Sequence, residues 1–311
     1  MKNKKNLRFP PIQSDVAIFK KDKKLTWFLG FCIIPAIALL VYLVVIPTIN
    51  VFSISLFNQT ALSTTRTFVG LENYAYLLKD DYFLQALTNT LKLMLVVPPV
   101  TLLLALIMAY IMTQSKLREK KFYRIVLFLP SILSLTVIGM LWTFIYNPNM
   151  GILNAVLKVI GLESWARMWL GDYKTALGAI AVVLVWINAG YYMVMYIAGI
   201  DGISPDIYEA ATIDGAGNWS KFWLITLPLL SNVIKTTVVL CISTVLSSSF
   251  LLVTVMTNGA PAGATSVLLQ YMYDQAFGNS NFGYAMAIAV VTLTIAFLLA
   301  QVSNWLTRKK D

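Results

Sequence analysis

The sequence contains no histidine, and only two of its 311 residues are cysteines. The absence of histidine excludes imidazole-based metal sites, catalytic triads and proton relays. Cys32 and Cys241 lie in apolar stretches without the spacing of metal ligands, so they predict neither a metal site nor a disulfide framework. Paired acids, or a nucleophile beside a base, are also missing. We therefore expect no metal, no cofactor and no catalytic residue, and hence no enzyme.

Charged residues are scarce too, at 12% of the chain against 58% hydrophobic residues, and the mean hydropathy is +0.73. A soluble domain carries roughly a quarter charged residues, so water is not the main solvent of this protein. The net charge of +10 could suit nucleic acid. The basic residues, however, form short clusters beside apolar runs and accompany no recognition motif, so we expect no nucleic-acid partner.

Long apolar runs dominate what is present, and six of them are long enough to cross a bilayer core. The sequence thus predicts an all-α integral membrane protein with a basic tail over 1–24, a membrane domain over 25–306 and a second tail over 307–311. The first run is too long for a signal peptide and has no cleavage site after it, so we expect an uncleaved span. Prolines in or beside the spans predict kinks at Pro35, Pro47, Pro98, Pro99 and Pro130. The predicted spans are 25–49, 88–112, 123–146, 175–199, 227–256 and 284–306.

Lysine and arginine set the predicted orientation. Seventeen of them fall in the two tails and in the loops over 113–124 and 200–226, whereas five fall in the loops on the other side. Because basic residues are retained on the cytoplasmic side, we expect both termini and both of these loops in the cytoplasm. An even number of spans agrees with this topology.

The loop over 200–226 is acidic, although the topology would favour basic residues there. Either it docks on a soluble protein, or its acids are tolerated because they contribute little to topology. Ser204, Pro205 and Asp206 predict a helix start with a serine cap, and the glycines at 215 and 217 predict its end. Asn218 is expected to cap a second short helix, so that the loop forms a helix–turn–helix elbow.

The elbow also carries a recognisable motif. Glu209, Ala210 and Ala211 are followed after three residues by Gly215, and after nine more by the run Ile225–Pro228. This spacing resembles the EAA loop of binding-protein-dependent ABC importer permeases. Further segments resemble the MalF-like sugar permeases of that family, so that the likeness covers roughly residues 25 to 306. These are Phe68–Tyr74, Asn147–Asn154, Trp169–Leu170, Tyr271, Phe282–Ala285 and Thr257–Pro261, in which Ala260 replaces the usual second glycine. The large external insertion and extra N-terminal spans of the maltose-specific member are absent.

The resemblance implies a type I ABC importer permease fold in a bacterial inner membrane. It implies that the elbow couples the permease to a cytoplasmic P-loop ATPase dimer, with Gly215 allowing the sharp turn. A second, related but distinct permease and an extracytoplasmic sugar-binding protein would complete the importer. None of the 16 glycines is followed by lysine, so this chain has no P-loop and ATP must be hydrolysed by another subunit. The implied coupling residues are Glu209, Ala210, Ala211, Asp214 and Gly215.

Aromatic rings beside amide and hydroxyl groups are the groups expected to bind sugar inside a span. The fourth and fifth spans supply both, and Trp186 and Tyr191 match sugar-contacting positions of the maltose permease. The alternative is that the serines allow close helix packing and the aromatics fill the core or the interface. The predicted substrate residues are Trp186, Asn188, Tyr191, Tyr192, Ser247 and Ser248.

Lys92 and Lys235 are the formal charges inside the predicted spans. Each lies near a span end, where lysine can extend to the interface, but one facing the cavity would favour an anionic solute. The identity of the solute therefore stays open between a sugar, in particular an oligosaccharide, and glycerol-3-phosphate or a polyol. A secondary transporter is the remaining alternative; proton-coupled carriers place Asp, Glu or His within their spans, and these spans hold none.

Overall fold

The computed structural model describes residues 23–60, 66–114 and 118–306. The predicted tail over 307–311 and most of that over 1–24 lie outside this part. The described chain is helical almost throughout, apart from one small antiparallel pair of strands, β1 (Phe57–Asn58) and β2 (Thr67–Phe68). It divides into a first unit that ends at Asn50 and a second that begins at Val51.

The first unit is one apolar helix. It comprises α1 (Lys23–Leu40), a π-helical turn η2 (Val41–Val45) and the start of α2 (Ile46–Ile54). The stretch Trp27–Ile54 is long and apolar enough to cross a membrane, which agrees with the predicted first span. Large apolar side chains occupy most positions of Trp27–Asn50, as a helix surrounded by lipid requires.

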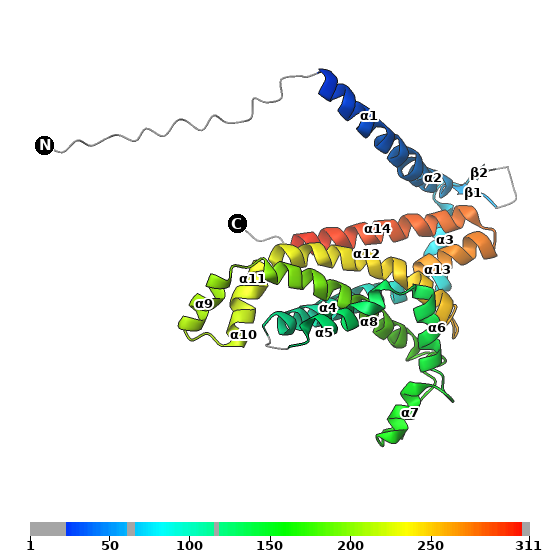
Figure 1. Ribbon diagram of the computed structural model, residues 1–311. Helices are drawn as coiled ribbons and strands as arrows, with labels where there is room; N and C mark the ends of the chain where they lie inside the picture. Colours follow the sequence, from blue (N-terminus) through cyan, green and yellow to red (C-terminus); the bar gives the residue numbers. More distant parts are fainter. Residues whose placement is uncertain (1–22, 61–65, 115–117, 307–311) are drawn as a thin grey trace. The chain divides into compact units, whose positions relative to one another are not determined.

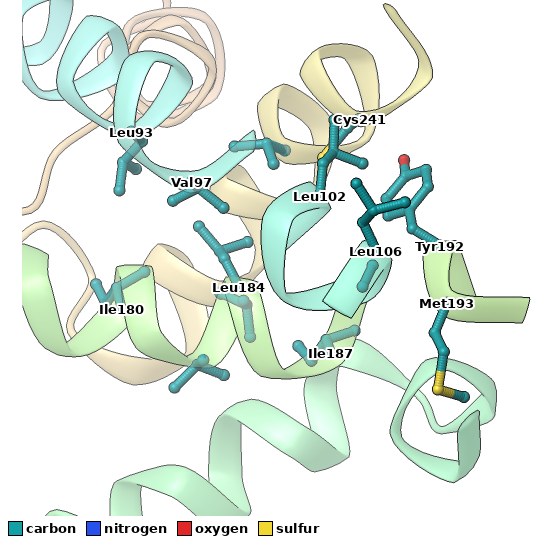
Figure 2. Packing of buried hydrophobic residues seen from close by; sticks show 14 of the residues in the cluster. Leu93, Val97, Leu102, Leu106, Ile180, Leu184, Ile187, Tyr192, Met193 and Cys241 are labelled. Atoms are coloured by element: carbon teal, nitrogen blue, oxygen red, sulfur yellow. The ribbon is translucent and has the colours of Figure 1, made fainter. Parts of the chain in front are cut away.

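Four long helices form the body of the second unit and lie side by side (Figure 1). Their apolar stretches match the second, fourth, fifth and sixth predicted spans. Leu93 and Val97 of the first of these helices face Ile180 and Leu184 of the second (Figure 2), and this pair forms the centre of the hydrophobic core. The helices are α4 (Asp81–Gln114), α8 (Ala176–Asp201), α12 (Ser231–Met256) and α14 (Phe282–Leu306).

The third predicted span, 123–146, is not one straight helix. It is broken into α5 (Lys120–Phe128), the 3-10 turn η3 (Leu129–Ile132) and α6 (Leu135–Ile145), with a bend of 101° between the two sides. Pro130 lies in this turn, where it lacks the N–H group that a continuing α-helix would need. With this bent pair counted as one span the described chain has up to six, as predicted.

A glycine allows α8 to approach the α5 side of the bend. A Cβ atom at Gly190 would lie 1.9 Å from the carbonyl oxygen of Leu127, far inside contact distance. Any larger residue at position 190 would therefore push α5 and α8 apart.

Short helices occupy both ends of the bundle (Figure 1). One end carries α3 (Glu72–Leu77), α7 (Ile152–Val159), η4 (Glu163–Trp165), α13 (Leu268–Tyr273) and η6 (Asp274–Gly278). The other carries α9 (Pro205–Ile213), α10 (Asn218–Lys221), η5 (Phe222–Thr226) and α11 (Leu227–Leu229). The predicted elbow is thus a separate structure at one end of the bundle.

Candidate functional site

The elbow helix begins as predicted at Pro205 with Ser204 in the N-cap position, but the Ser204 side chain makes no capping hydrogen bond. The hydroxyl of Ser204 donates to Oδ2 of Asp206 at 3.2 Å instead of accepting a backbone N–H. The carbonyl of Ser204 accepts the N–H of Ile207 at 3.2 Å and so begins the helical hydrogen bonding. Proline at the first helical position needs no N–H partner, which is why α9 starts here without a side-chain cap.

The turn between α9 and α10 depends on Gly215, whose φ is +79°. The N–H of Ala216 donates to the carbonyl of Ala211 at 2.9 Å, and that of Gly215 to Thr212 at 3.1 Å. This is a Schellman ending, which favours glycine because a Cβ atom is unfavourable in the left-handed region. The predicted Asn218 cap is wrong, since Gly217 takes the N-cap position and Asn218 is the first residue of α10.

The predicted coupling residues form an exposed surface, with one exception. Glu209, Ala210, Asp214 and Gly215 are exposed, whereas Ala211 is buried on the inner face of α9. Large apolar side chains are exposed beside the acids, namely Ile207, Ile213 and Trp219. An exposed surface that mixes apolar side chains with acids on a short helix is typical of a docking site for another protein.

The elbow is held from within by polar contacts. Nζ of the buried Lys221 donates to Oγ1 of Thr212 at 2.7 Å, which joins α10 to α9. The hydroxyls of Tyr208 and Thr226 lie 2.9 Å apart and join α9 to η5. The second short helix then runs through η5 and α11 into α12, so the elbow leads directly into that long helix.

A second attachment joins the elbow to α4. The hydroxyl of Tyr110 donates to the carbonyl of Asn218 at 2.6 Å, and its ring packs edge-on against Phe222 with centroids 4.9 Å apart. The sequence analysis missed Tyr110, because no local pattern connects a tyrosine in one span with a loop 108 residues later. The elbow is therefore attached to three of the four long helices, by the chain itself to α8 and α12 and by Tyr110 to α4.

The substrate residues predicted on α8 divide between surface and core. Trp186 and Tyr191 are exposed, whereas Asn188 and Tyr192 are 5% and 0% exposed. The amide of Asn188 donates to the carbonyl of Leu184 within its own helix at 2.8 Å, and the Tyr192 hydroxyl lies 3.5 Å from Oγ1 of Thr244. In this conformation both side chains are buried in the bundle. Tyr192 contacts Thr244 of α12, Asn188 bonds within α8, and neither lies on the exposed surface that carries Trp186 and Tyr191.

Trp186 lines an apolar cavity of about 910 Å³ between α4, α5 and α8. Its ring meets that of Trp142 edge-on, with centroids 5.5 Å apart. The other lining residues include Val100, Pro130 and Gly190, and none of them carries a hydrogen-bonding side chain. The polar partners for a hydroxyl-rich solute must therefore come from elsewhere.

Such partners form a stripe along α12. Its exposed residues recur every three or four positions and so lie on one face of the helix, and all but Leu240 are polar. Ser247 belongs to this face, whereas Ser248 is buried against the bundle. Asn232 and Thr236 are four positions apart, a spacing that places them on one helix face and could have been read from the sequence. This polar stripe consists of Asn232, Thr236, Leu240, Ser243 and Ser247.

The two intramembrane lysines differ in exposure. Lys92 is exposed on α4, and Lys235 is half-buried on α12 between two members of the polar stripe, Asn232 and Thr236. A polar stripe within a span is unfavourable against lipid, so this face of α12 is a candidate wall of a translocation pathway.

At the opposite end of the bundle, the segment from Phe68 to Tyr74 positions a structural amide. Nδ2 of Asn73 donates to the carbonyls of Ser55 and Phe57 at 2.8 and 3.1 Å. The Tyr74 hydroxyl lies 2.7 Å from Oγ of Ser55. This recognisable segment therefore closes the loop between α2 and α3 onto the end of α2.

The turn after α12 explains why Ala260 can replace a glycine. The left-handed residues are Asn258 and Gly259 before it and Ala262 and Gly263 after it, with φ between 46° and 82°. Ala260 itself is not left-handed, so a Cβ atom costs nothing there. The departure from the family pattern at this position is conformationally neutral.

Asp80 forms a polar centre at this end of the bundle that the sequence analysis missed. Its Oδ2 accepts hydrogen bonds from the hydroxyls of Tyr271, at 2.6 Å, and Tyr284, while Oδ1 accepts the N–H groups of Tyr82 and Phe83. Burial alone would raise the pKa of Asp80, but these hydrogen bonds together hold it below its ordinary value. Burial and the nearby carboxylate raise the pKa of Tyr271, which keeps its proton for donation.

Comparison with known proteins gives consistent matches along the chain. Residues 85–311 match the family model described as binding-protein-dependent transport system inner membrane component. The probable ABC transporter permease protein YurN of Bacillus subtilis is 37% identical over 90% of this chain and 96% of its own length. The diacetylchitobiose uptake system permease protein NgcF of Streptomyces coelicolor is 35% identical over 89% of this chain and 81% of its own.

A solved structure shares the fold. It is a bacterial ABC transporter involved in the import of the acidic polysaccharide alginate. The TM-score is 0.78 at 23% sequence identity, and the match covers 93% of this chain and 97% of the other. The arrangement of helices described above is therefore that of an ABC importer permease, as the sequence analysis predicted.

Proposed function

Since the chain belongs to the inner membrane components of binding-protein-dependent transport systems, we propose that it is one of two pore-forming permeases of an ATP-driven sugar importer. The protein is a multi-pass inner membrane protein of the MalF-like permease group. The observation that carries the proposal is the elbow, with its exposed Glu209 and its left-handed Gly215. It gives a protein without a P-loop a surface through which a separate ATPase can act.

The elbow and the basic residues favour a cytoplasmic position for this end of the bundle. Arg118 lies just before α5, and Lys120, Lys121 and Arg124 lie in its first turns, at the same end of the bundle as α9 and α10 (Figure 1). We propose that both termini lie on this side, as positive-inside orientation requires. Glu209 then meets a basic residue of a P-loop ATPase dimer, in a charge-assisted contact that stays engaged while the ATPase moves.

The solute pathway is proposed to lie between this chain and a second, related but distinct permease. The polar stripe of α12 and the exposed rings of Trp186 and Tyr191 face outward from the bundle rather than into it. Asn188, Tyr192 and Ser248 would have to move to reach the solute, so they would contribute in another state of the transport cycle. An extracytoplasmic binding protein delivers the solute to this pathway.

Sugar, and among sugars an oligosaccharide, is the solute class that the polar stripe supports best. Its polar members are neutral hydroxyls and one amide, which hydrogen-bond to neutral hydroxyl-rich solutes. NgcF, the relative named for diacetylchitobiose uptake, agrees with this choice. An anionic solute such as glycerol-3-phosphate would need a cation on this face, and Lys235 would have to supply it; a polyol would need only the hydroxyl groups.

Purification of the tagged chain from its native membrane tests the assembly. We expect a second six-span permease and a P-loop ATPase to copurify with it. In proteoliposomes containing the binding protein, Glu209→Ala should reduce ATP-driven uptake of labelled sugars at least tenfold, whereas Asp206→Ala, on the same helix, should not. A chain that copurifies with no ATPase, or a Glu209→Ala variant with normal uptake, would contradict the proposal.

A further inference from the structure

The helix α7, between the bent third span and α8, has a firmly attached inner face. Asn154 is 5% exposed, and its Nδ2 donates to the carbonyls of Pro148 and Arg167 at 3.2 and 3.0 Å. Its Oδ1 accepts the indole N–H of Trp169 at 2.8 Å. Leu153 packs on the main hydrophobic core beside it. The orientation of α7 about its own axis is therefore fixed.

The outer face of α7 is apolar, although no residue in the described part of the chain covers it. Ile152, Val156 and Val159 are 66%, 49% and 87% exposed. With Ala155 and Ile160 they recur at the three- and four-residue spacing of one helix face. A surface helix normally turns its apolar face to the core and its polar face to water. Here the exposed stripe is the apolar one, so another apolar phase must cover it.

The flanks of this helix carry the residues typical of a membrane interface. Trp165 and Met168 are exposed just beyond it, and Lys158 lies in its last turn. Arg167 is exposed, with its guanidinium over the ring of Trp169 at 5.5 Å. Tryptophan and cationic side chains around an apolar stripe are the residues that hold helices at the headgroup level.

The position of α7 agrees with this chemistry. It lies at the end of the bundle opposite α9 and α10 and points away from the long helices (Figure 1). The preceding helix α6 carries its own exposed apolar stripe, with Val137, Met140, Leu141 and Phe144. The apolar surface of the membrane-spanning part thus continues onto α7.

We propose that the outer face of α7 lies in the bilayer interface, in the leaflet opposite the elbow, with its apolar stripe at the acyl–headgroup boundary. Lys158 and Arg167 then lie at the level of the lipid phosphates, whose negative charge attracts these cationic side chains. A protein partner is disfavoured because the stripe offers no hydrogen-bonding group and no acid, whereas protein interfaces carry about one hydrogen bond per 100–200 Å². The segment between the bent span and α8 is therefore held on two sides, by Asn154 within the protein and by lipid outside it.

Site-directed spin labelling tests this placement. Single-cysteine variants Val156→Cys and Val159→Cys, with Cys32 and Cys241 replaced by alanine, carry a nitroxide label. Glu163→Cys, an exposed residue of η4 in the same segment, is the matched control. The chain is reconstituted with its copurifying subunits in nanodiscs of phosphatidylcholine and phosphatidylglycerol. Label accessibility is measured to oxygen, which partitions into lipid, and to a nickel chelate, which stays in water.

We expect the oxygen-to-nickel accessibility ratio at both α7 positions to exceed that at position 163 several-fold. Equal ratios at the three positions would show that the face lies in water and would overturn the proposal. Low accessibility to both reagents at positions 156 and 159 would show that a protein subunit covers the face, which would overturn it equally. Because two positions on one stripe are compared, a local disturbance at either label cannot produce the expected pattern.

Discussion

Asp80 and Tyr271 lie 191 positions apart in the sequence, yet the tyrosine hydroxyl donates a 2.6 Å hydrogen bond to the aspartate carboxylate. Tyr284 donates to the same oxygen. The junction of α3 and α4 is thereby joined to α13 and to the start of α14. These two hydrogen bonds hold early and late helices of the second unit together at the end of the bundle opposite the elbow.

Removal of one donor should weaken this junction measurably. Tyr271→Phe deletes the hydroxyl and keeps the ring. We expect it to reduce the free energy of unfolding by about 1 kcal/mol, less than the roughly 1.5–3 kcal/mol of a hydrogen bond to a buried charge, because Asp80 is only partly buried. Thermal unfolding in detergent measures the change. Tyr273→Phe, on the same helix and exposed, is the control and should leave the midpoint unchanged. Equal effects of the two variants would contradict the structural role of the hydroxyl.

The same junction should make stability depend on acid pH. The folded-state pKa of Asp80 lies below its ordinary value, so its contribution is fully present above the unfolded-state pKa of roughly 3.9 and is lost as pH falls through the folded-state pKa. The thermal unfolding midpoint should therefore decrease as the pH is lowered below about 4. Asp80→Asn should lose that part of the pH dependence. An identical acid profile in the variant would show that other carboxyl groups account for it.

The turn of the elbow should tolerate substitution at one glycine and not at the other. Gly215→Ala places a Cβ atom in the left-handed region, at a cost of about 1–2 kcal/mol. Gly217→Ala is the matched control, because its φ is −69° and a Cβ atom there meets nothing within 4 Å. We expect ATP-driven uptake to fall several-fold in Gly215→Ala and to stay normal in Gly217→Ala, with both proteins inserted in the membrane. Equal uptake in the two variants would rule out a functional role for the left-handed turn.

Tyr110 should act as a positioning residue for the elbow. Tyr110→Phe removes the hydrogen bond to Asn218 and keeps the ring packing on Phe222. We expect the ATPase still to bind, but fewer solute molecules to be imported per ATP hydrolysed, because the elbow can then move without α4. Tyr123→Phe, exposed on α5, is the control. A proportional loss of uptake and ATP hydrolysis would indicate weaker docking rather than weaker transmission.

Trp186 should contribute to solute binding and not to binding of the ATPase. Trp186→Ala removes an exposed ring from α8, and we expect the KM for uptake to rise several-fold while copurification with the ATPase stays normal. Loss of copurification would instead assign Trp186 to packing, through its contact with Trp142.

Local patterns in the sequence predicted the spans and the elbow correctly. Hydropathy is a property of consecutive residues, so the apolar runs located five helices and the bent pair without knowledge of their neighbours. The elbow was predicted because proline and glycine act on their own backbone, at Pro205 and Gly215. Ser204 takes the predicted N-cap position without a side-chain cap, and Asn218 is not the N-cap residue. Several local hydrogen-bond partners compete for such side chains, and only the folded geometry selects among them.

Only the tertiary structure decided which side of each helix is buried and which distant residues meet. The burial of Asn188 and Tyr192 and the contacts of Asp80 and Tyr110 with residues more than 100 positions away all depend on packing between helices. Within a membrane span apolar residues surround the helix on every side, so the amphipathic pattern that reveals the buried face of a soluble helix is weak. The sequence by itself therefore determined that this chain crosses the membrane and carries an elbow, because both follow from neighbouring residues. The tertiary structure decided which face of each helix is buried and what holds the elbow, because both depend on residues that only folding brings together.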